Sequence, residues 1–406
     1  MTSSDSTCPA YPMARDPKCP FDPPRELARL QAEAPVSRVT QWDGGTPWLV
    51  TGYDELRAVL ADRRASGDTA LPGFPHMSAS MAARHSKGRT FINMDDPDHA
   101  AQRRKLNADF TVRRIETMRP KVQQIVDGLI DDMLASPKPA DLVQALALPV
   151  PSLVICELLG VPYEDRALFH RLSVTLNSQT ATPAASAAAM DDLIAYLEGL
   201  VDRKNADPGN DLLSRLVVSE LRGGTMARDE LARMARLLLV AGHDTTANMI
   251  ALGTALLLEN PDELARLREK SDDLAFVSSA VEELLRYLTV THLGRRRVAL
   301  EDLDVDGAHI AAGEGIIAAA DIANRDPRVF ADPDRLDLGR NPREHVAFGF
   351  GIHQCLGQSL ARLELQVVYG TLYKRIPTLA LAEPVDKLDF KHELAVYGLN
   401  ALPVTW

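Results

Sequence analysis

The chain has 406 residues, of which 46% are apolar, and this composition excludes an intrinsically disordered chain. Its formal net charge of −11 argues against binding to nucleic acid or to an anionic membrane surface. No stretch has the roughly 18 apolar residues of a membrane span, and the N-terminus lacks a signal-peptide pattern. The four cysteines, Cys8, Cys19, Cys156 and Cys355, are too scattered for a disulfide framework, so we predict a cytoplasmic protein.

The domain organisation is predicted to be simple. The Pro-bearing stretches 136–150 and 177–185 are short and lie between helical patterns, which suits loops better than domain boundaries. We therefore predict a flexible segment over residues 1–20 and a single domain over residues 21–406.

The N-terminal part combines helices with a small sheet. Residues 24–34 and 53–62 have helical patterns, and between them SRVTQW and PWLVTG predict a hairpin that turns at residues 43–45. From residue 97 the patterns are mostly helical, over 97–109, 113–135, 141–160, 164–176, 186–204, 210–221 and 226–259. The last of these helices would be roughly 50 Å long and is the predicted central helix.

The pattern changes toward the C-terminus. Asn260 and Pro261 predict the start of another helix, and 273–287 is helical too. Short strands follow in RRRVAL, LDVDGAHI and GIIAAA, and then a coil over residues 325–347. The predicted fold class is mainly α with a minor β part.

A glycine-rich loop around one cysteine is the first candidate site. In FGFGIHQCLGQ, residues 348–358, the glycines Gly349, Gly351 and Gly357 allow turns and close backbone approach, so a flat cofactor could lie against this backbone. The helix predicted after Cys355 would favour the thiolate through its N-terminal N–H groups. Cys355 is therefore a candidate axial metal ligand; the alternative is a small buried cysteine beside a helix cap.

The second candidate lies within the long helix, in AGHDTT, residues 241–246. Gly242, Asp244 and Thr245 interrupt an apolar run, and Gly242 opens room beside the helix axis. Asp244 and Thr245 would then form a proton relay beside a groove for a small molecule. The alternative is a polar kink satisfied by its own backbone.

Two further groups of charged residues are singled out. Glu283 and Arg286 in EELLR lie one turn apart, and Arg335 is the predicted third member of a buried triad; a surface salt bridge is the alternative. Cations that could grip a carboxylate, or could simply be solvated, are His99, Arg103, Arg297 and His353.

A local excess of basic residues contrasts with the acidic whole. The run from Arg103 to Lys121 also contains Arg104, Lys105, Arg113, Arg114 and Arg119, against Asp109 and Glu116. It is either a solvated helix face or a docking patch for an acidic protein.

Together these residues resemble the cytochrome P-450 family over essentially residues 20–406. FGFGIHQCLG is similar to the haem-binding pattern, AGHDTT to the oxygen-activation motif, EELLR to the Glu-any-any-Arg motif and PDRL to the arginine element of the coil. The motifs also occur in the family's order and spacing.

The resemblance implies roles for individual residues. Cys355 matches the thiolate ligand of haem b, with Phe348, Gly349 and Gly357 in the ligand loop, and Asp244 and Thr245 match the acid and alcohol that deliver protons during oxygen activation. Glu283, Arg286 and Arg335 match the structural triad, and the positions that hold the haem propionates are His99, Arg103, Arg297 and His353.

The resemblance also implies a substrate class and partners. The chain is similar to actinobacterial hydroxylases of sterols, macrolides and other polyketides, which use O2 and electrons from an acidic ferredoxin with its reductase. The pocket is predicted from 64–92, 163–200, 237–245, 288–294 and 394–398, with the residues Leu237, Val240, Ala241, Val290, His292, Leu293 and Val396. We expect a monomer that inserts one oxygen atom into a C–H bond of a bulky apolar molecule.

Two alternatives stay open. Nitric oxide reductases resemble this pattern but take electrons directly from NADH and do not need the acid–alcohol pair, which is intact here as Asp244 and Thr245. A non-catalytic haem sensor or carrier would not need a proton relay. A peroxide-driven monooxygenase is a further variant.

Overall fold

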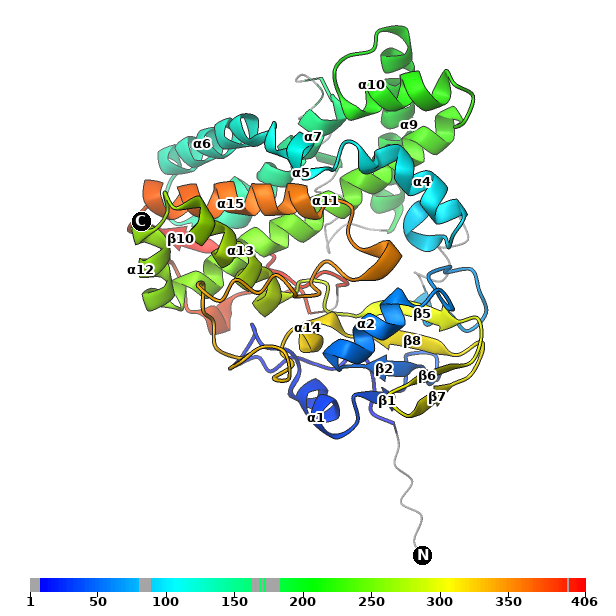
Figure 1. The fold of residues 1–406 in the computed structure, drawn as a ribbon. Helices are drawn as coiled ribbons and strands as arrows, with labels where there is room; N and C mark the ends of the chain where they lie inside the picture. The colour runs from blue at the N-terminus through cyan, green and yellow to red at the C-terminus, as the bar shows by residue number, and fades with distance from the viewer. Residues whose placement is uncertain are drawn as a thin grey trace, which may run out of the picture. The chain divides into compact units, whose positions relative to one another are not determined.

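The computed structural model describes residues 8–79, 89–162, 165, 168, 171–172, 183–392 and 394–406. The chain is mainly helical with a minor β part, which confirms the predicted fold class (Figure 1). No helix in the described ranges is both long and apolar enough to cross a bilayer.

The helix boundaries follow capping and proline signals in the sequence. Asp273 caps α13, where its carboxylate accepts hydrogen bonds from the backbone N–H groups of Ala275 and Phe276 at 3.0 and 3.2 Å. The longer helices are α1 Arg25–Glu33, α2 Tyr53–Ala61, α4 Asp98–Asn107, α6 Arg119–Ala135, α7 Pro149–Leu159, α9 Pro183–Ala206, α11 Arg228–Leu258, α12 Pro261–Glu269, α13 Leu274–Leu288 and α15 Gln358–Arg375. Shorter helices are α5 Val112–Glu116, α10 Leu212–Leu216 and α14 Ala320–Ala323.

The chain forms two compact units. The first comprises the chain up to Arg104, residues 252–358 and residues 384–400. The second comprises residues 105–251, 359–383 and 401–406. The single domain over 21–406 stays a prediction.

The first unit contains a five-stranded sheet with the order β1-β2-β8-β5-β3. Its strands are β1 Val36–Arg38, β2 Trp48–Val50, β3 Ala65–Ser66, β5 Arg295–Ala299 and β8 Gly315–Ala318. The predicted hairpin is confirmed, since β1 pairs antiparallel with β2. β2 pairs parallel with β8, which pairs antiparallel with β5. Helix α2 lies across this sheet and buries its apolar residues against it (Figure 1), while β6 Leu303–Val305 and β7 Ala308–Ile310 form a separate hairpin.

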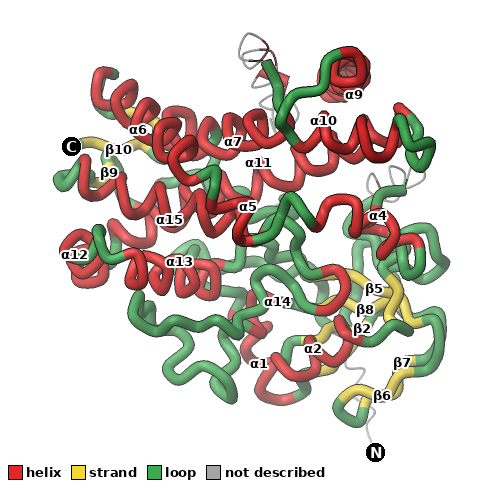
Figure 2. Tube along the Cα trace, turned by 45° about the horizontal axis from the view of Figure 1, so that its top comes forward, coloured by secondary structure: helices red, strands yellow, loops and turns green. Residues whose placement is uncertain are grey.

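The second unit joins helices to a small sheet of β4 Ala140–Asp141, β10 Pro403–Thr405 and β9 Ala380–Leu381. α15 is bound to α6 by ion pairs from Arg375 to Asp127 at 3.1 Å and to Asp131 at 2.5 Å. The Tyr369 hydroxyl on α15 donates to the Met249 carbonyl of α11 at 2.6 Å. These helices are the red tubes labelled in Figure 2.

The helix predicted over 141–160 is divided in the structure. Residues 140–141 form strand β4, a π-helical turn covers Val143–Ala147, and α7 begins at Pro149. Proline has no backbone N–H, so Pro149 and Pro151 suit the first turn of a new helix better than the interior of a long one. Most of the helix predicted over 164–176 lies outside the described residues.

The N-terminal segment differs from the predicted flexible tail. Residues 1–7 lie outside the described part, but Tyr11 and Arg15 are buried in the first unit. The backbone N–H of Tyr11 donates to the Thr40 carbonyl at 2.8 Å, and the Arg15 guanidinium lies 4.2 Å from the centre of the Tyr397 ring. From residue 8 onward the segment is therefore part of the packed unit.

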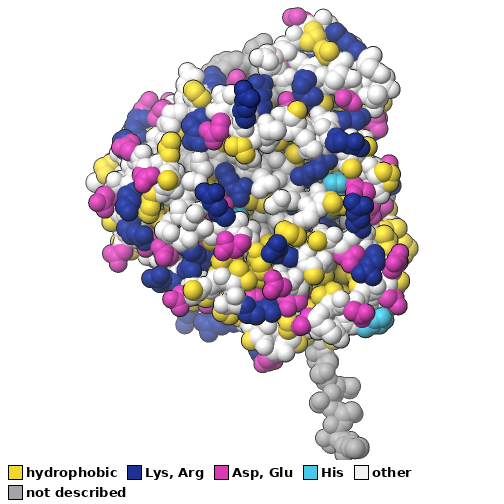
Figure 3. Space-filling model, in the orientation of Figure 1, with side chains coloured by type: hydrophobic (Ala, Val, Ile, Leu, Met, Phe, Trp, Pro, Cys, Tyr) yellow, Lys and Arg dark blue, Asp and Glu magenta, His cyan; other side chains and the backbone are white. Residues whose placement is uncertain are grey.

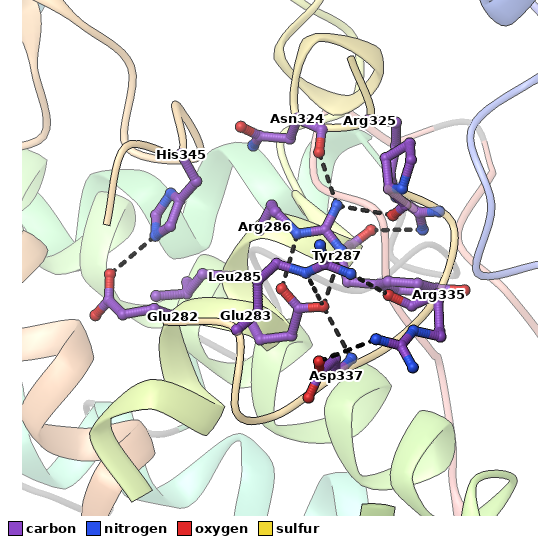
Figure 4. Close-up of polar contacts among 12 residues, drawn as sticks. Glu282, Glu283, Leu285, Arg286, Tyr287, Asn324, Arg325, Arg335, Asp337 and His345 are labelled. Carbon is purple, nitrogen blue, oxygen red and sulfur yellow. Dashed lines mark hydrogen bonds and ion pairs between the residues drawn. The ribbon is translucent and has the colours of Figure 1, made fainter. Parts of the chain in front are cut away.

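The coil over 325–347 is anchored by a buried ion pair. Glu283 and Arg286 are fully buried, and the guanidinium donates to both carboxylate oxygens at 2.8 and 2.9 Å. The third nitrogen, Nη1 of Arg286, donates to the carbonyls of Asn324 and Pro333 at 2.8 and 2.9 Å (Figure 4). The pair therefore ties α13 directly to the coil.

The predicted third member of this triad was wrong. Nε of Arg340 donates to Glu283 Oε1 at 3.1 Å. The exposed Arg335 instead pairs with Asp337 at 3.2 Å (Figure 4). A tight turn, in which the N–H of Arg335 donates to the Asp332 carbonyl at 3.0 Å, directs the Arg335 side chain outward. Arg340 is therefore the residue that completes the cluster.

Two contacts hold the end of the coil in place. His345 Nε2 lies 3.0 Å from the Glu282 carboxylate, and the N–H of Val346 donates to the Asn324 side chain at 2.8 Å. The coil is thus fixed just before Phe348, where the glycine-rich loop begins.

We expect Arg340→Ala to destabilise the protein more than Arg335→Ala. Loss of Arg340 removes a hydrogen bond to a buried carboxylate, which should lower the free energy of unfolding by ~1.5–3 kcal/mol. Loss of Arg335 removes an exposed pair and should cost less than ~1 kcal/mol. Urea denaturation of both variants measures the difference, and equal destabilisation would contradict the reassignment.

Candidate functional site

The loop from Phe348 to Gly357 has a fixed backbone conformation. The N–H of Cys355 donates to the Phe348 carbonyl at 2.9 Å, and Gly349 and Gly351 have φ angles of +75° and +73°. A Cβ on Gly351 would lie 2.2 Å from the Leu60 carbonyl oxygen, so only glycine allows this approach to the end of α2. The loop therefore holds Cys355 in one place.

Cys355 lies three residues before the start of α15, as predicted. Cys355 forms no disulfide and is half-buried, and a Cβ on Gly357 would meet only Cys355 Sγ at 4.0 Å. In the described part of the chain, no three His, Cys, Asp or Glu residues cluster as a metal site would need. A single thiolate on a fixed loop can serve as one axial ligand of a metal whose other ligands belong to a cofactor.

The predicted cations gather beside this loop in the first unit. The rings of His99 and His353 lie 4.4 Å apart, and Arg103 Nη2 donates to the Gln354 carbonyl at 2.6 Å. Arg297 is buried in β5, where Nη1 donates to the Arg296 carbonyl at 2.7 Å. The partly buried ring of Phe348 lies 5.9 Å from that of His345.

Several polar atoms here lack partners among the described residues. Nε2 of His99 and Nε2 of His353 are buried without a hydrogen bond. Burial, reinforced by the charge of Arg297 and by His99, lowers the pKa of His353 to about 3, and burial lowers the pKa of Arg297 to about 10. Burial is the main cause of both shifts, and the Asp95 carboxylate opposes each of them only in part. The residues present therefore fit a flat cofactor with carboxylates, such as haem b.

The predicted relay lies on α11 in the second unit. The Thr245 hydroxyl donates to the Ala241 carbonyl at 2.9 Å, a backbone bond of the kind that the alternative interpretation of this segment requires. Asp244 Oδ1 accepts a hydrogen bond from Asn248 Nδ2 at 3.1 Å. A Cβ on Gly242 would meet nothing within 4 Å, so there is room beside the helix at this point.

The pocket residues predicted on α11 share one helix face with the relay. Leu237, Val240, Ala241, Asp244 and Thr245 follow a spacing of three and four residues. This face is accessible although it is largely apolar, since 45% of Val240 is exposed. An accessible apolar helix face suits contact with an apolar ligand.

The other predicted pocket residues lie in the first unit. Val290, His292 and Leu293 are buried, and Val396 is half-buried. His292 Nε2 lies 2.7 Å from the Leu394 carbonyl, and the N–H of Tyr397 donates to the Val290 carbonyl at 2.7 Å. Segments 288–294 and 394–398 are thus bonded to each other. Of the other predicted segments, 80–88 and much of 163–182 lie outside the described residues.

Sequence reasoning missed two polar residues of the second unit. Asn248 follows Asp244 by one helix turn, a spacing that could have indicated the pair. Glu364 on α15 is buried with Oε2 unpartnered, and burial raises its pKa well above the usual range. A lone glutamate within a helix gives no sequence signal of burial.

The chain was compared with protein families and with known proteins. A cytochrome P450 family profile matches residues 186–376. Cytochrome P450 GfsF of Streptomyces halstedii is 51% identical over 98% of this chain and 96% of its own, and the crystal structure of GfsF, covering 98% and 100%, has a TM-score of 0.94.

Two further relatives have names that state a substrate. A vitamin D3 dihydroxylase of Streptomyces griseolus is 45% identical over 100% of this chain and 98% of its own. The mycinamicin VIII C21 methyl hydroxylase MycCI of Micromonospora griseorubida, solved with mycinamicin VIII bound, is 39% identical, covers 98% and 100% of the two chains, and has a TM-score of 0.89.

We expect His292 to make stability depend on pH. Burial and the Arg15 charge, with a smaller effect of His392, lower the pKa of His292 from 6.5 to about 4. Between these values the unfolded chain binds a proton that the folded chain does not, so stability falls as the pH decreases from 6.5 toward 4. His292→Gln should lose ~2 kcal/mol less stability than the wild type between pH 8 and pH 5, measured by urea denaturation. Equal losses would contradict a buried neutral His292.

Proposed function

We propose that this chain hydroxylates a C–H bond of a bulky apolar molecule of the sterol, macrolide or polyketide type. The proposal starts from the fact that the chain belongs to the cytochrome P450 family and is a haem b-dependent monooxygenase. The observation that carries the proposal is the accessible apolar face of α11, from Leu237 to Ala241, which ends at Asp244 and Thr245. The aliphatic side chains of this face can contact an apolar substrate, and Asp244 and Thr245 at its end can supply protons to the reaction.

Cys355 is the proposed iron ligand, and His99, Arg103, Arg297 and His353 are the proposed contacts of the propionates. The supporting observations are a half-buried cysteine in a fixed loop and buried imidazole nitrogens that have no partners among the described residues. When bound, haem b supplies the iron at which O2 is activated. The chain supplies the thiolate, the cations that balance the carboxylates, and the enclosure.

Asp244 and Thr245 are proposed to hold and move the protons that the reaction consumes. The Thr245 hydroxyl is oriented by its bond to Ala241, and its oxygen keeps lone pairs that can accept a hydrogen bond from water. Asn248 fixes one carboxylate oxygen of Asp244. An oriented alcohol beside an anchored acid is suited to general acid catalysis.

The proposed substrate class rests on the aliphatic side chains and on the relatives. Leu237, Val240, Val290, Leu293 and Val396 are aliphatic, and the names of two relatives state vitamin D3 and mycinamicin VIII as substrate or ligand. Apolar pockets with few polar groups bind such ligands largely through burial of their surface.

The electron donor is proposed to be an acidic ferredoxin that is reduced by its own reductase. Arg113 and Arg114 on α5 are exposed, and neither has an ion-pair partner among the described residues. The basic side chains of one face are dark blue in Figure 3. Unpaired exposed cations can steer an acidic partner and accelerate its association.

The test begins with a panel of sterols and macrolides added to the purified haem protein. We expect at least one to shift the Soret band toward the high-spin form and to be hydroxylated when NADPH and a ferredoxin chain are supplied. Thr245→Ala should keep the carbon monoxide band of thiolate-ligated haem and the substrate shift, while product per NADPH falls on the order of tenfold or more and peroxide rises.

The matched control is Thr246→Ala, because Thr246 is the adjacent threonine but is buried on another side of the helix. We expect this variant to couple NADPH to product as the wild type does. Unchanged coupling in Thr245→Ala would reject the relay, and turnover of NADH with nitric oxide in place of hydroxylation would reject the proposed reaction.

The docking proposal predicts a salt-dependent defect. The double variant Arg113→Glu, Arg114→Glu should lower kcat/KM for reduced ferredoxin by about tenfold or more at low salt and by less at high salt. Reduction by dithionite should stay unchanged. Arg222→Glu reverses another exposed arginine as the control, and an equal effect of this control would contradict a local docking patch.

A further inference from the structure

Three consecutive arginines, Arg295, Arg296 and Arg297, open strand β5. Side chains alternate between the faces of a strand, so Arg295 and Arg297 share one face and Arg296 points the other way. Arg296 donates to the carbonyls of Pro75 and Leu293, each at 3.0 Å. Of these three arginines, the sequence motifs indicated only Arg297. The structure shows that Arg295 lies on the same face of β5 as Arg297.

The Arg295 guanidinium lies against the ligand loop. Its Nη2 donates to the Ala347 carbonyl at 2.9 Å, and a Cβ on Gly349 would lie 2.8 Å from its Nε. Burial lowers the pKa of Arg295 and of Arg103, and the nearby Cys355 opposes part of this shift at each. Arg295 therefore belongs to the surroundings of the proposed iron ligand.

Arg295 forms no ion pair with a carboxylate among the described residues, where its Nε is also buried without a hydrogen bond. Arg297, whose charge is on the same strand face, adds like-charge repulsion. An enclosed cation without a counter-ion is costly, yet parts of the Arg295 side chain remain accessible. Because Arg295 is only partly buried, an anionic group of a bound ligand can reach its guanidinium.

From this geometry we propose that Arg295 is an additional cation of the haem site, which balances propionate charge and raises the reduction potential of the haem iron. The proposal rests on the proposed function, since it requires haem bound at Cys355. Reduction of ferric to ferrous iron adds one electron and no proton at this site. A fixed positive charge beside the ligand loop therefore stabilises the reduced form and favours acceptance of the first electron from the redox partner.

The simplest alternative is that Arg295 only clamps the loop through the Ala347 carbonyl. Arg295→Lys separates the two roles, because lysine keeps the charge but loses the planar guanidinium contact. Arg295→Gln removes the charge. Arg296→Gln is the matched control, since it removes a charge from the same strand on the opposite face.

The experiment is potentiometric titration of the haem protein, together with the rate of haem loss to a haem-scavenging apoprotein. In Arg295→Gln we expect the equilibrium for one-electron reduction to fall about tenfold, a shift of ~59 mV, and haem loss to accelerate. Arg295→Lys should keep most of the wild-type potential, and Arg296→Gln should change it less than Arg295→Gln does.

The outcomes separate this inference from the proposed function. A wild type without the carbon monoxide band of thiolate-ligated haem would reject the proposed function. With that band intact, an unchanged potential in Arg295→Gln would overturn the role of Arg295. If Arg295→Gln alone cannot retain haem while the other variants do, the loss supports the charge contact. Equal failure of all three variants would overturn it, because the defect would then belong to the strand.

Discussion

Enclosed guanidinium groups without a carboxylate partner are the constraint on which the candidate site depends. Arg295 and Arg297 share one face of β5, and neither forms an ion pair among the described residues. Enclosing a cation without an anion costs several kcal/mol or lowers its pKa, and burial lowers the pKa of both arginines. His99 and His353 add buried nitrogen atoms without partners. The polypeptide is therefore electrostatically incomplete at this place, and a cofactor with carboxylates would complete it. Cofactor binding and stability should accordingly be coupled in this protein.

The cluster around Glu283 shows the opposite arrangement in the same unit. Arg286 and Arg340 share the Glu283 carboxylate, and the remaining donors of Arg286 reach backbone carbonyls of the coil. This cluster is satisfied within the protein, so it can stabilise the coil whether or not a cofactor is present. The coil then leads to the loop that holds Cys355. Buried charges that are paired within the protein, as around Glu283, thus hold the coil in position. Buried cations that have no carboxylate partner, as on β5, would instead pair with a bound ligand.

Whether the position of a residue could be predicted depends on how far along the chain its interaction partners lie. The start of α15 after Cys355 and the β1–β2 hairpin depend on neighbours in the sequence, and both were predicted from it. The sequence did not predict that Arg340, and not Arg335, bonds Glu283. The choice depends on how a turn directs two arginines that are five residues apart. Burial of Tyr11 and Arg15 depends on partners far along the chain, such as Tyr397. The orientation of Arg295 likewise required the register of β5 against β8.

The segments of the first unit that are predicted to face the substrate are held by bonds that do not use the valine and leucine side chains of the proposed pocket. The N–H of Tyr397 donates to the Val290 carbonyl, and His292 bonds the Leu394 carbonyl from a neutral ring. Val290, Leu293 and Val396 contribute only apolar surface, so their exchange for other apolar residues would reshape the pocket while the backbone stays in place. Arg15, whose guanidinium lies against the Tyr397 ring, extends the same support to the N-terminal segment, so residues far apart in the sequence hold the predicted pocket segments of the first unit together.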